Sequence, residues 1–228
     1  MDPIISKVMR AVGRMVSPGD RIVAAVSGGA DSVVMTHLLK EMMVKTPPFE
    51  LAIAHLNHLT RGEDSREDAA FVAQLGEKLD LETFIEEIDV AVEKKRMKTS
   101  FQEAARIVRY EFLERVLKKW GGTWIALGHT ADDQVETVLM NLLRGSGTRG
   151  LSGMPPQRDS LIRPLHECFR HEVEAYANRC GLVFRSDTTN QSDDYLRNRV
   201  RRELIPLLES YNPQVKSTLI ETSRIVND

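Results

Sequence analysis

The 228-residue sequence predicts an α/β fold: a doubly wound, mostly parallel sheet with a small C-terminal helical appendage. Short runs of β-branched and other apolar residues alternate with longer stretches whose apolar residues recur every three or four positions. This alternation is typical of a parallel sheet covered by helices. After residue 145 the chain becomes rich in glycine, proline and serine, and only helical patterns follow, which predicts the appendage.

The elements of the sheet follow one another along the first two thirds of the chain. Apolar residues at helical spacing occupy 4–16, and an SPGD turn separates them from the β-branched run at 21–26. Ser100 followed by Glu103 is a capping box, which predicts the start of a long helix. We expect strands at 21–26, 49–57, the first part of 81–90 and 123–128, and helices at 4–16, 32–43, 68–79, 100–120 and 132–144.

The chain after residue 145 is expected to hold a long loop and helices at 166–181 and 193–211. We therefore divide the whole chain into an α/β domain at 1–150 and a loop and helical segment at 151–228. The last residues are helix-forming without a clear cap, so we expect the parent protein to continue beyond them.

Ligands of such sheets bind beyond the carboxyl ends of the strands, where the chain turns into the helices. Three polar stretches occupy those turns, at 27–32, 55–65 and 128–134. We expect them to converge on one crevice, with 58–68 as a mobile loop.

The composition is that of an ordinary soluble protein, with 42% hydrophobic residues, 28% charged residues and a net charge of −2. Nucleic-acid binding would therefore depend on local basic patches.

No signal peptide is evident, and no stretch reaches the roughly 18 apolar residues that span a bilayer. Cys168 and Cys180 fit no metal or redox pair and are expected to be buried free thiols. We expect a cytoplasmic protein without membrane contact.

The stretch SGGADS at 27–32 lies between a predicted strand and a predicted helix. It supplies backbone amides, flexible glycines, hydroxyls and a helix N-terminus, which are the parts of an anion site. The lysine of the Walker pattern is absent, and Asp31 in its place suits a Mg²⁺ that bridges phosphates. A plain turn with an aspartate near the helix start is the alternative. The ATP-binding candidates are Ser27, Gly28, Gly29, Ala30, Asp31 and Ser32.

SGGADS resembles the SGGxDS pyrophosphate loop of the N-type ATP pyrophosphatases. That resemblance implies a Rossmann-like fold of the adenine nucleotide alpha hydrolase type, and makes residues 1–150 a PP-loop ATP pyrophosphatase domain. It also implies ATP and Mg²⁺, with cleavage of ATP between the α- and β-phosphates and adenylation of a substrate.

Further stretches are similar to the tRNA(Ile)-lysidine synthase family over nearly the whole chain. They are AHLNHLTRGEDSREDAAFV (54–72), EAARIVRYEFL (103–113), LGHTADDQVETVLMNLLRGSGTRGLSGM (127–154), IRPL (162–165), DTTN (187–190) and YLRNRVRRELIPLL (195–208). The resemblance implies ligation of free L-lysine to carbon 2 of the wobble cytidine of an isoleucine tRNA. An adenylated cytidine is the intermediate, AMP and pyrophosphate are released, and codon recognition changes from AUG to AUA. Family members often carry further C-terminal tRNA-binding domains, to which 151–228 would lead.

Arg106 and Arg109 of the 100–120 helix share one face, apart from its apolar stripe. Aimed at the crevice, this pair would bind the α-phosphate or the tRNA backbone through bidentate contacts. A solvated charged face is the alternative. The expected stripe is Ala105, Val108, Phe112 and Val116.

His129 and Asp133 lie at the end of the fourth strand and the start of the next helix. The resemblance implies that they face the reacting base or the metal, with Asp133 positioning or deprotonating the lysine amine. Helix capping is the alternative for Asp133 and its neighbour Asp132. Glu136 is a further candidate. His55 is expected at the end of the second strand near the adenine, with a packing role as the alternative. The expected catalytic residues are Asp31, Arg109, His129 and Asp133.

The stretch RNRVRR at 197–202 concentrates arginines that would give salt-dependent RNA affinity. A solvated helix face balanced by nearby acidic residues is the alternative. The expected tRNA-binding residues are Arg106, Arg144, Arg197, Arg199 and Arg201.

Two other classes of function are alternatives. A tRNA 2-thiolation enzyme shares the SGGxDS loop but typically uses clustered cysteines, which this sequence lacks. A non-catalytic RNA- or nucleotide-binding module would not need the intact loop at 27–32. The sequence does not determine the oligomeric state, and a homo-oligomer is one of the alternatives.

Overall fold

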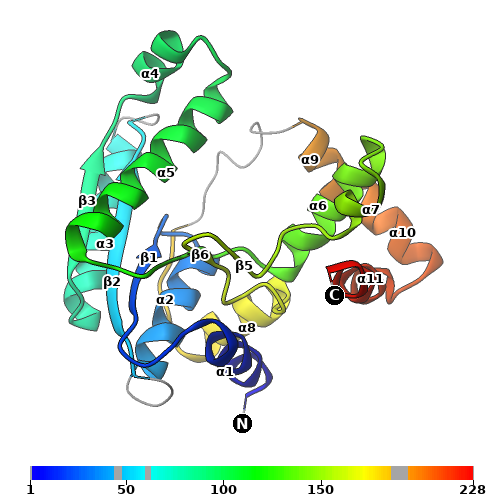
Figure 1. Cartoon of the computed structure of the whole chain (residues 1–228), viewed down its shortest axis with the longest axis horizontal. Helices are drawn as coiled ribbons and strands as arrows, with labels where there is room; N and C mark the ends of the chain where they lie inside the picture. Colours follow the sequence, from blue (N-terminus) through cyan, green and yellow to red (C-terminus); the bar gives the residue numbers. More distant parts are fainter. Residues whose placement is uncertain (1, 44–47, 60–62, 186–194, 228) are drawn as a thin grey trace.

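The computed structural model describes residues 2–43, 48–59, 63–185 and 195–227. The DTTN stretch at 187–190 lies outside the described residues. Figure 1 shows helices on both sides of a central sheet, and a further group of helices beside it. None of the helices in the described ranges has the length and apolarity needed to cross a bilayer.

The sheet has six strands in the order β3-β2-β1-β4-β6-β5. All neighbouring strands are parallel except β5, which runs antiparallel to β6. The order changes direction between β1 and β4, which is the switch point where ligands bind in such sheets. The predicted doubly wound, mostly parallel sheet is therefore confirmed. Its strands are β1 (Arg21–Ala25), β2 (Glu50–Asn57), β3 (Thr83–Glu87), β4 (Trp124–Ala126), β5 (Gln157–Arg158) and β6 (Leu161–Ile162).

Helices bury both faces of this sheet. In β1, Ile22 and Ala24 lie in one core cluster, whereas Val23 between them lies in another. Successive side chains of a strand point to opposite faces, so a strand covered on both sides needs a continuous apolar run. The first cluster packs against α1 (Pro3–Met15), α2 (Ala30–Met42), α3 (Glu63–Leu79) and α8 (Arg170–Arg179), and the second against α5 (Phe101–Trp120).

Several elements differ from the sequence prediction. The stretch expected as a mobile loop is helical from Glu63, and its sequence EDSRED has the acidic residues typical of a helix start. The short helix α4 (Val90–Met97) was not predicted, because its charged sequence has no apolar stripe. The expected long loop contains α7 (Gly147–Leu151), β5 and β6. Strands of two residues are too short to show an alternating pattern.

Residues 151–180 complete the α/β unit instead of forming an appendage. Strand β6 pairs with β4, and Val173, Tyr176 and Ala177 of α8 lie in the core cluster shared with α1 and α2. The helical group beside the sheet is built around Val135 and Leu139. Its members are α6 (Ala131–Leu143), α7, α9 (Tyr195–Arg199), α10 (Ile205–Tyr211) and α11 (Val215–Asn227).

The helix predicted at 193–211 contains a π-helical turn, Val200–Leu204, between α9 and α10. Pro206 has no N–H to donate, so the regular hydrogen-bond ladder is interrupted there. The N–H of Ile205 donates instead to the carbonyl of Val200, five residues back. Such turns often occur at functional sites, and this one lies next to the arginines that contact α6.

Candidate active site

The turn between β1 and α2 holds its shape through Ser32. The Ser32 hydroxyl donates to the carbonyl of Gly29 at 2.9 Å and accepts from the N–H of Ser27 at 3.2 Å. The residue before α2, Gly29, offers no side chain to cap the helix. The first amides of α2 therefore lack a side-chain cap, and at the positive end of the helix dipole they are suited to an anion.

Two glycines permit this arrangement. Gly28 has a φ of 93°, a conformation that favours glycine. At Gly128, after β4, an added Cβ would lie 3.2 Å from the nitrogen of Ser32. The end of β4 can therefore approach the turn at 27–32 only because residue 128 has no side chain.

Asp31 carries the strongest sign of a missing partner at this turn. Its Oδ1 is buried and has no hydrogen-bond partner among the described residues, and its Oδ2 lies 3.6 Å from Nη2 of Arg170. Burial raises the pKa of Asp31 to about 6, although the positive charge of Arg170 opposes the shift. A second cation beside this carboxylate would relieve the cost of burying it.

Asp133 is bound by residues from two elements. Its Oδ2 accepts from the N–H of Thr130 at 2.8 Å, and its Oδ1 accepts from Nη2 of Arg197 at 3.0 Å. Burial on its own would raise the pKa of Asp133, but the Thr130 hydrogen bond and the charge of Arg197 outweigh it and lower the pKa. Asp133 is thus an ionised carboxylate whose two oxygens already have partners. The capping role considered in the sequence analysis is present.

Glu136 lies one turn further along α6 and is almost fully buried. Both of its oxygens accept hydrogen bonds of 2.6 Å, one from Nε of Arg197 and the other from Nε of Arg201. Neither arginine lies on the solvated face that was one interpretation of the sequence. Both side chains are about one third exposed, at 35% and 31%, and their pairing with Glu136 weakens the prediction that they bind tRNA.

Three histidines lie at the ends of two strands: His55 at the end of β2, His58 in the turn after β2, and His129 in the turn after β4. His58 and His129 each have a buried Nδ1 without a hydrogen-bond partner in the described chain. Burial lowers the pKa of each to about 4, and the charge of Arg109 contributes to both shifts. Nδ1 of His55 lies 2.8 Å from the carbonyl of Val26, so this nitrogen carries the proton and Nε2 is an acceptor.

Arg109 therefore lies close enough to both turns to act on their histidines. Its side chain keeps contact with solvent, yet the surrounding protein desolvates the guanidinium enough to lower its pKa. That Arg109 faces the bound substrate stays a prediction. In the apolar stripe of α5, the buried alanine is Ala104, and the predicted Ala105 is only partly buried.

The other predicted arginines lie on the surface. The guanidinium of Arg106 lies 5.1 Å from the centre of the Tyr110 ring. Nε of Arg199 donates to Glu203 at 3.0 Å. Arg144 ends α6 as an exposed residue beside Leu142 and Leu143, which are both 58% exposed.

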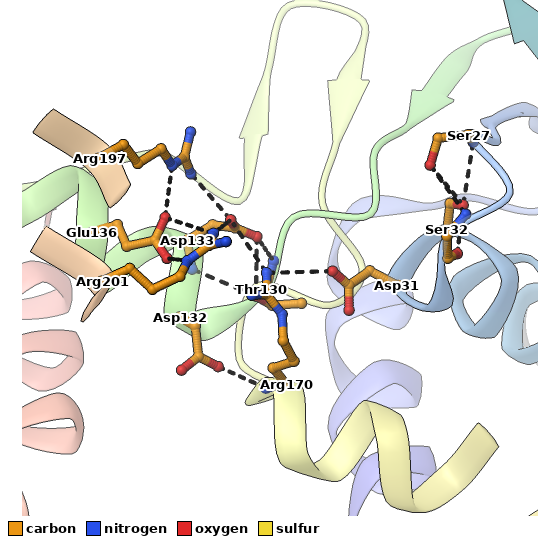
Figure 2. A network of polar contacts seen from close by, with 11 residues as sticks. Ser27, Asp31, Ser32, Thr130, Asp132, Asp133, Glu136, Arg170, Arg197 and Arg201 are labelled. Atoms are coloured by element: carbon orange, nitrogen blue, oxygen red, sulfur yellow. Dashed lines mark hydrogen bonds and ion pairs between the residues drawn. The ribbon is translucent and has the colours of Figure 1, made fainter. Parts of the chain in front are cut away.

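Two arginines that contact the turn at 27–32 were not predicted from the sequence. Arg170 starts α8 and lies between Asp31 and Asp133 (Figure 2). A positive charge at a helix N-terminus is unfavourable without anions nearby, and this signal could have identified it. Arg185 donates its N–H to the carbonyl of Gly28 at 2.9 Å and its Nε to Asp68 at 2.9 Å, which connects the turn to α3.

No group of three or more metal-binding side chains occurs in the part of the chain that the structure describes. Asp31 with its unpartnered oxygen is suited to a cation that takes most of its ligands from phosphates and water, as Mg²⁺ does.

Cys168 is buried and Cys180 is exposed, so the expectation of two buried thiols was wrong for Cys180. The exposed end of α8 leaves that residue uncovered.

A family model described as a PP-loop domain matches residues 3–208. The chain belongs to the PP-loop family. The turn at 27–32 is thus a PP loop, and it follows β1 at the switch point of the sheet, where this fold class binds its ligands.

Curated PP-loop relatives share about two fifths of the sequence. The tRNA(Ile)-lysidine synthase of Dehalococcoides mccartyi is 40% identical over 98% of this chain and 49% of its own length. That of Geobacter sulfurreducens is 41% identical over 100% of the chain and 49% of its own length. The chain therefore spans about half the length of the curated relatives it matches.

Solved structures support the fold. The U34-tRNA thiolase NcsA from Methanococcus maripaludis, solved with an iron–sulfur cluster, has a TM-score of 0.77 and 22% identity, covering 98% of this chain and 79% of its own. An NH3-dependent NAD synthetase from Campylobacter jejuni has a TM-score of 0.51 and 17% identity, covering 99% and 93%. At these identities the likeness shows the fold alone.

Proposed function

We propose that this chain carries out the ATP-dependent chemistry of a tRNA(Ile)-lysidine synthase. The observation that supports this best is the identity of about 40% to such enzymes along nearly the whole chain. In this reaction the wobble cytidine of an isoleucine tRNA is adenylated by ATP, and free L-lysine then displaces AMP to give lysidine. Pyrophosphate leaves in the first step.

The PP loop is the proposed site of the leaving pyrophosphate. Negative charge increases on the leaving group as the bond to the α-phosphate breaks, and the outward amides of α2 would stabilise it. Mg²⁺, held by Asp31, would neutralise further phosphate charge. His55, whose Nε2 is an acceptor, would hydrogen-bond the amino group of the adenine.

Arg109, His129 and Asp133 are the proposed residues around the cytosine. Arg109 would bind the α-phosphate or the flipped base through its planar guanidinium. His129 would be a neutral hydrogen-bonding group. Of the two roles expected for Asp133, its low pKa and occupied oxygens favour positioning over removal of a proton from the amine.

Contacts to the tRNA backbone are proposed for the exposed arginines. Arg106, Arg144 and Arg199 are on the surface, where each added phosphate contact would increase the salt dependence of binding. Arg197 and Arg201 have a smaller proposed role, because their charges are already paired with Glu136 and Asp133.

Release of pyrophosphate tests this proposal. We expect release from ATP to require an isoleucine tRNA with a cytidine wobble base, and lysidine to form only when lysine is also added. A tRNA with uridine at that position is the matched control. No release with this tRNA would favour a nucleotide-binding module, and release that does not require tRNA would contradict adenylation of the cytidine. A 2-thiolation activity is disfavoured, because Cys168 is buried and Cys180 lies on the surface at the end of α8.

A further inference from the structure

Arg170 lies between the PP loop and the start of α6. It occupies the first position of α8, where the helix dipole disfavours a positive charge. Its Nη2 lies 3.6 Å from Oδ2 of Asp31 and 3.9 Å from Oδ1 of Asp133. Figure 2 shows the side chain projecting from α8 towards these two carboxylates. The arginine therefore depends on the anions around it.

The backbone below this side chain is fixed by the start of α6. The N–H of Arg170 donates to Oδ2 of Asp132 at 2.6 Å, and the N–H of Ala131 donates to the carbonyl of Cys168 at 2.8 Å. Lys216 of α11 lies 3.4 Å from the other oxygen of Asp132. A binding side chain needs this kind of supporting contact to be held in place before its ligand arrives.

The contacts of the guanidinium itself are long. Charge-assisted hydrogen bonds measure roughly 2.7–2.9 Å, and Arg197 and Arg201 reach Glu136 at 2.6 Å. Arg170 reaches its two carboxylates only at 3.6 and 3.9 Å, and its side chain is 33% exposed. Within the described residues its guanidinium donates no hydrogen bond. Most of its five donors are therefore available to a ligand.

We propose that Arg170 binds the phosphate oxygens of ATP that leave as pyrophosphate. Asp31 is part of the PP loop, so a guanidinium beside its carboxylate also lies beside the phosphates that the loop would bind. When a cation takes over as the counter-charge of Asp31, Arg170 turns its donors to the phosphates, which its planar fork fits. This inference rests on the proposed use of ATP by the PP loop, and is independent of the tRNA substrate.

Binding measurements without tRNA test the role of Arg170. The dissociation constants of ATP, pyrophosphate and AMP are measured by titration calorimetry with Mg²⁺ for the wild type and for Arg170→Ala and Arg170→Lys. We expect Arg170→Ala to weaken ATP and pyrophosphate by about 10- to 100-fold, the effect of a lost charge-assisted hydrogen bond. AMP binding changes less than about 2-fold, because AMP lacks the leaving phosphates. Lysine recovers part of the loss, since it keeps the charge without the fork.

Arg179→Ala is the matched control, because Arg179 lies on the same helix and pairs with Asp2. It leaves all three affinities unchanged. Unaltered ATP and pyrophosphate binding in a folded Arg170→Ala protein would overturn the inference, as would an equal loss for AMP. If Arg170→Ala does not fold, Arg170→Lys carries the same comparison.

ATP binding and lysidine formation by the wild type distinguish failure of the proposed function from failure of the inference about Arg170. A wild type that binds no ATP contradicts both that function and the role of Arg170. A wild type that binds ATP but forms no lysidine contradicts only the tRNA reaction, and the expected loss in Arg170→Ala still supports the inference.

Discussion

Glu136 accepts a hydrogen bond of 2.6 Å from Nε of Arg197, which joins the middle of α6 to α9. Glu136 is only 1% exposed, so arginines and not water balance its charge. Arg197 also donates to Asp133 at 3.0 Å. The same arginine therefore joins two helices of the helical group and, together with the Thr130 hydrogen bond, keeps Asp133 ionised.

Removal of the Glu136 charge should destabilise the protein strongly. Glu136→Gln leaves Arg197 and Arg201 without their carboxylate, and a broken buried pair costs about 3–5 kcal/mol of the free energy of unfolding. Urea unfolding of the two proteins measures the difference. The matched control is Glu203→Gln, which removes the exposed partner of Arg199 and should cost less than about 1 kcal/mol. Equal losses in the two variants would contradict the importance of the buried cluster.

The stability of the protein should decrease in mild acid. The folded pKa values of His58 and His129 are about 4, mainly because the residues are buried, against 6.5 for a free histidine. Between these values the unfolded chain binds protons that the folded chain does not, so stability is lost as the pH falls through this window. We expect unfolding free energies at pH 7 and pH 5 to differ less in His58→Asn and His129→Asn than in the wild type. An unchanged pH dependence in both variants would show that these rings are protonated in the folded protein.

The approach of β4 to the PP loop should require a glycine at residue 128. In Gly128→Ala the new methyl group meets the backbone of Ser32 at 3.2 Å, so the loop must shift. We expect weaker ATP binding in a titration. Gly13→Ala in α1 meets nothing within 4 Å, and should bind ATP normally while gaining about 0.5–1 kcal/mol of stability. Normal ATP binding by Gly128→Ala would mean that the loop tolerates the shift.

Only one cysteine should react readily with a thiol reagent. Burial raises the pKa of Cys168 to about 12, whereas Cys180 is exposed at the end of α8. We expect one thiol to react in the native protein and both after unfolding. The fast reaction should disappear in Cys180→Ser. Two fast thiols in the native wild type would contradict the burial of Cys168.

Arg109 should affect the reaction more than the fold. Its charge contributes to the lowered pKa of His58 and of His129, in the turns after β2 and β4. Arg109→Ala should therefore slow lysidine formation by roughly 100-fold, as loss of a preorganised donor does. Arg115→Ala is the control, because Arg115 lies on the same helix and pairs with Glu86 on the surface. Similar rates in the two variants would remove Arg109 from the active site.

The sequence predicted the features that depend on residues close together in the chain. Alternating strands and helices gave the parallel sheet, and SGGADS gave the PP loop, because a turn and its helix start are encoded within six residues. Strands β5 and β6 were missed because each has only two residues. Their place in the sheet depends on the pairing of β6 with β4 and of β5 with β6.

The charge partners could not be predicted in the same way. The spacing of Arg197 and Arg201 shows that they share a face, but not that this face covers Glu136 on another helix. Arg170 was missed for the same reason, since Asp31 and Asp133 are distant from it in sequence. Helical periodicity defines a face, and tertiary contacts determine what that face touches.

Mass analysis of the tRNA product is the most direct test of whether this protein forms lysidine. An isoleucine tRNA with a cytidine wobble base is incubated with the protein, ATP, Mg²⁺ and isotopically labelled lysine. The account predicts that the anticodon fragment carries one labelled lysine on the wobble cytidine, and that no label appears without ATP. An unmodified wobble cytidine, from a protein that binds ATP under the same conditions, would contradict it.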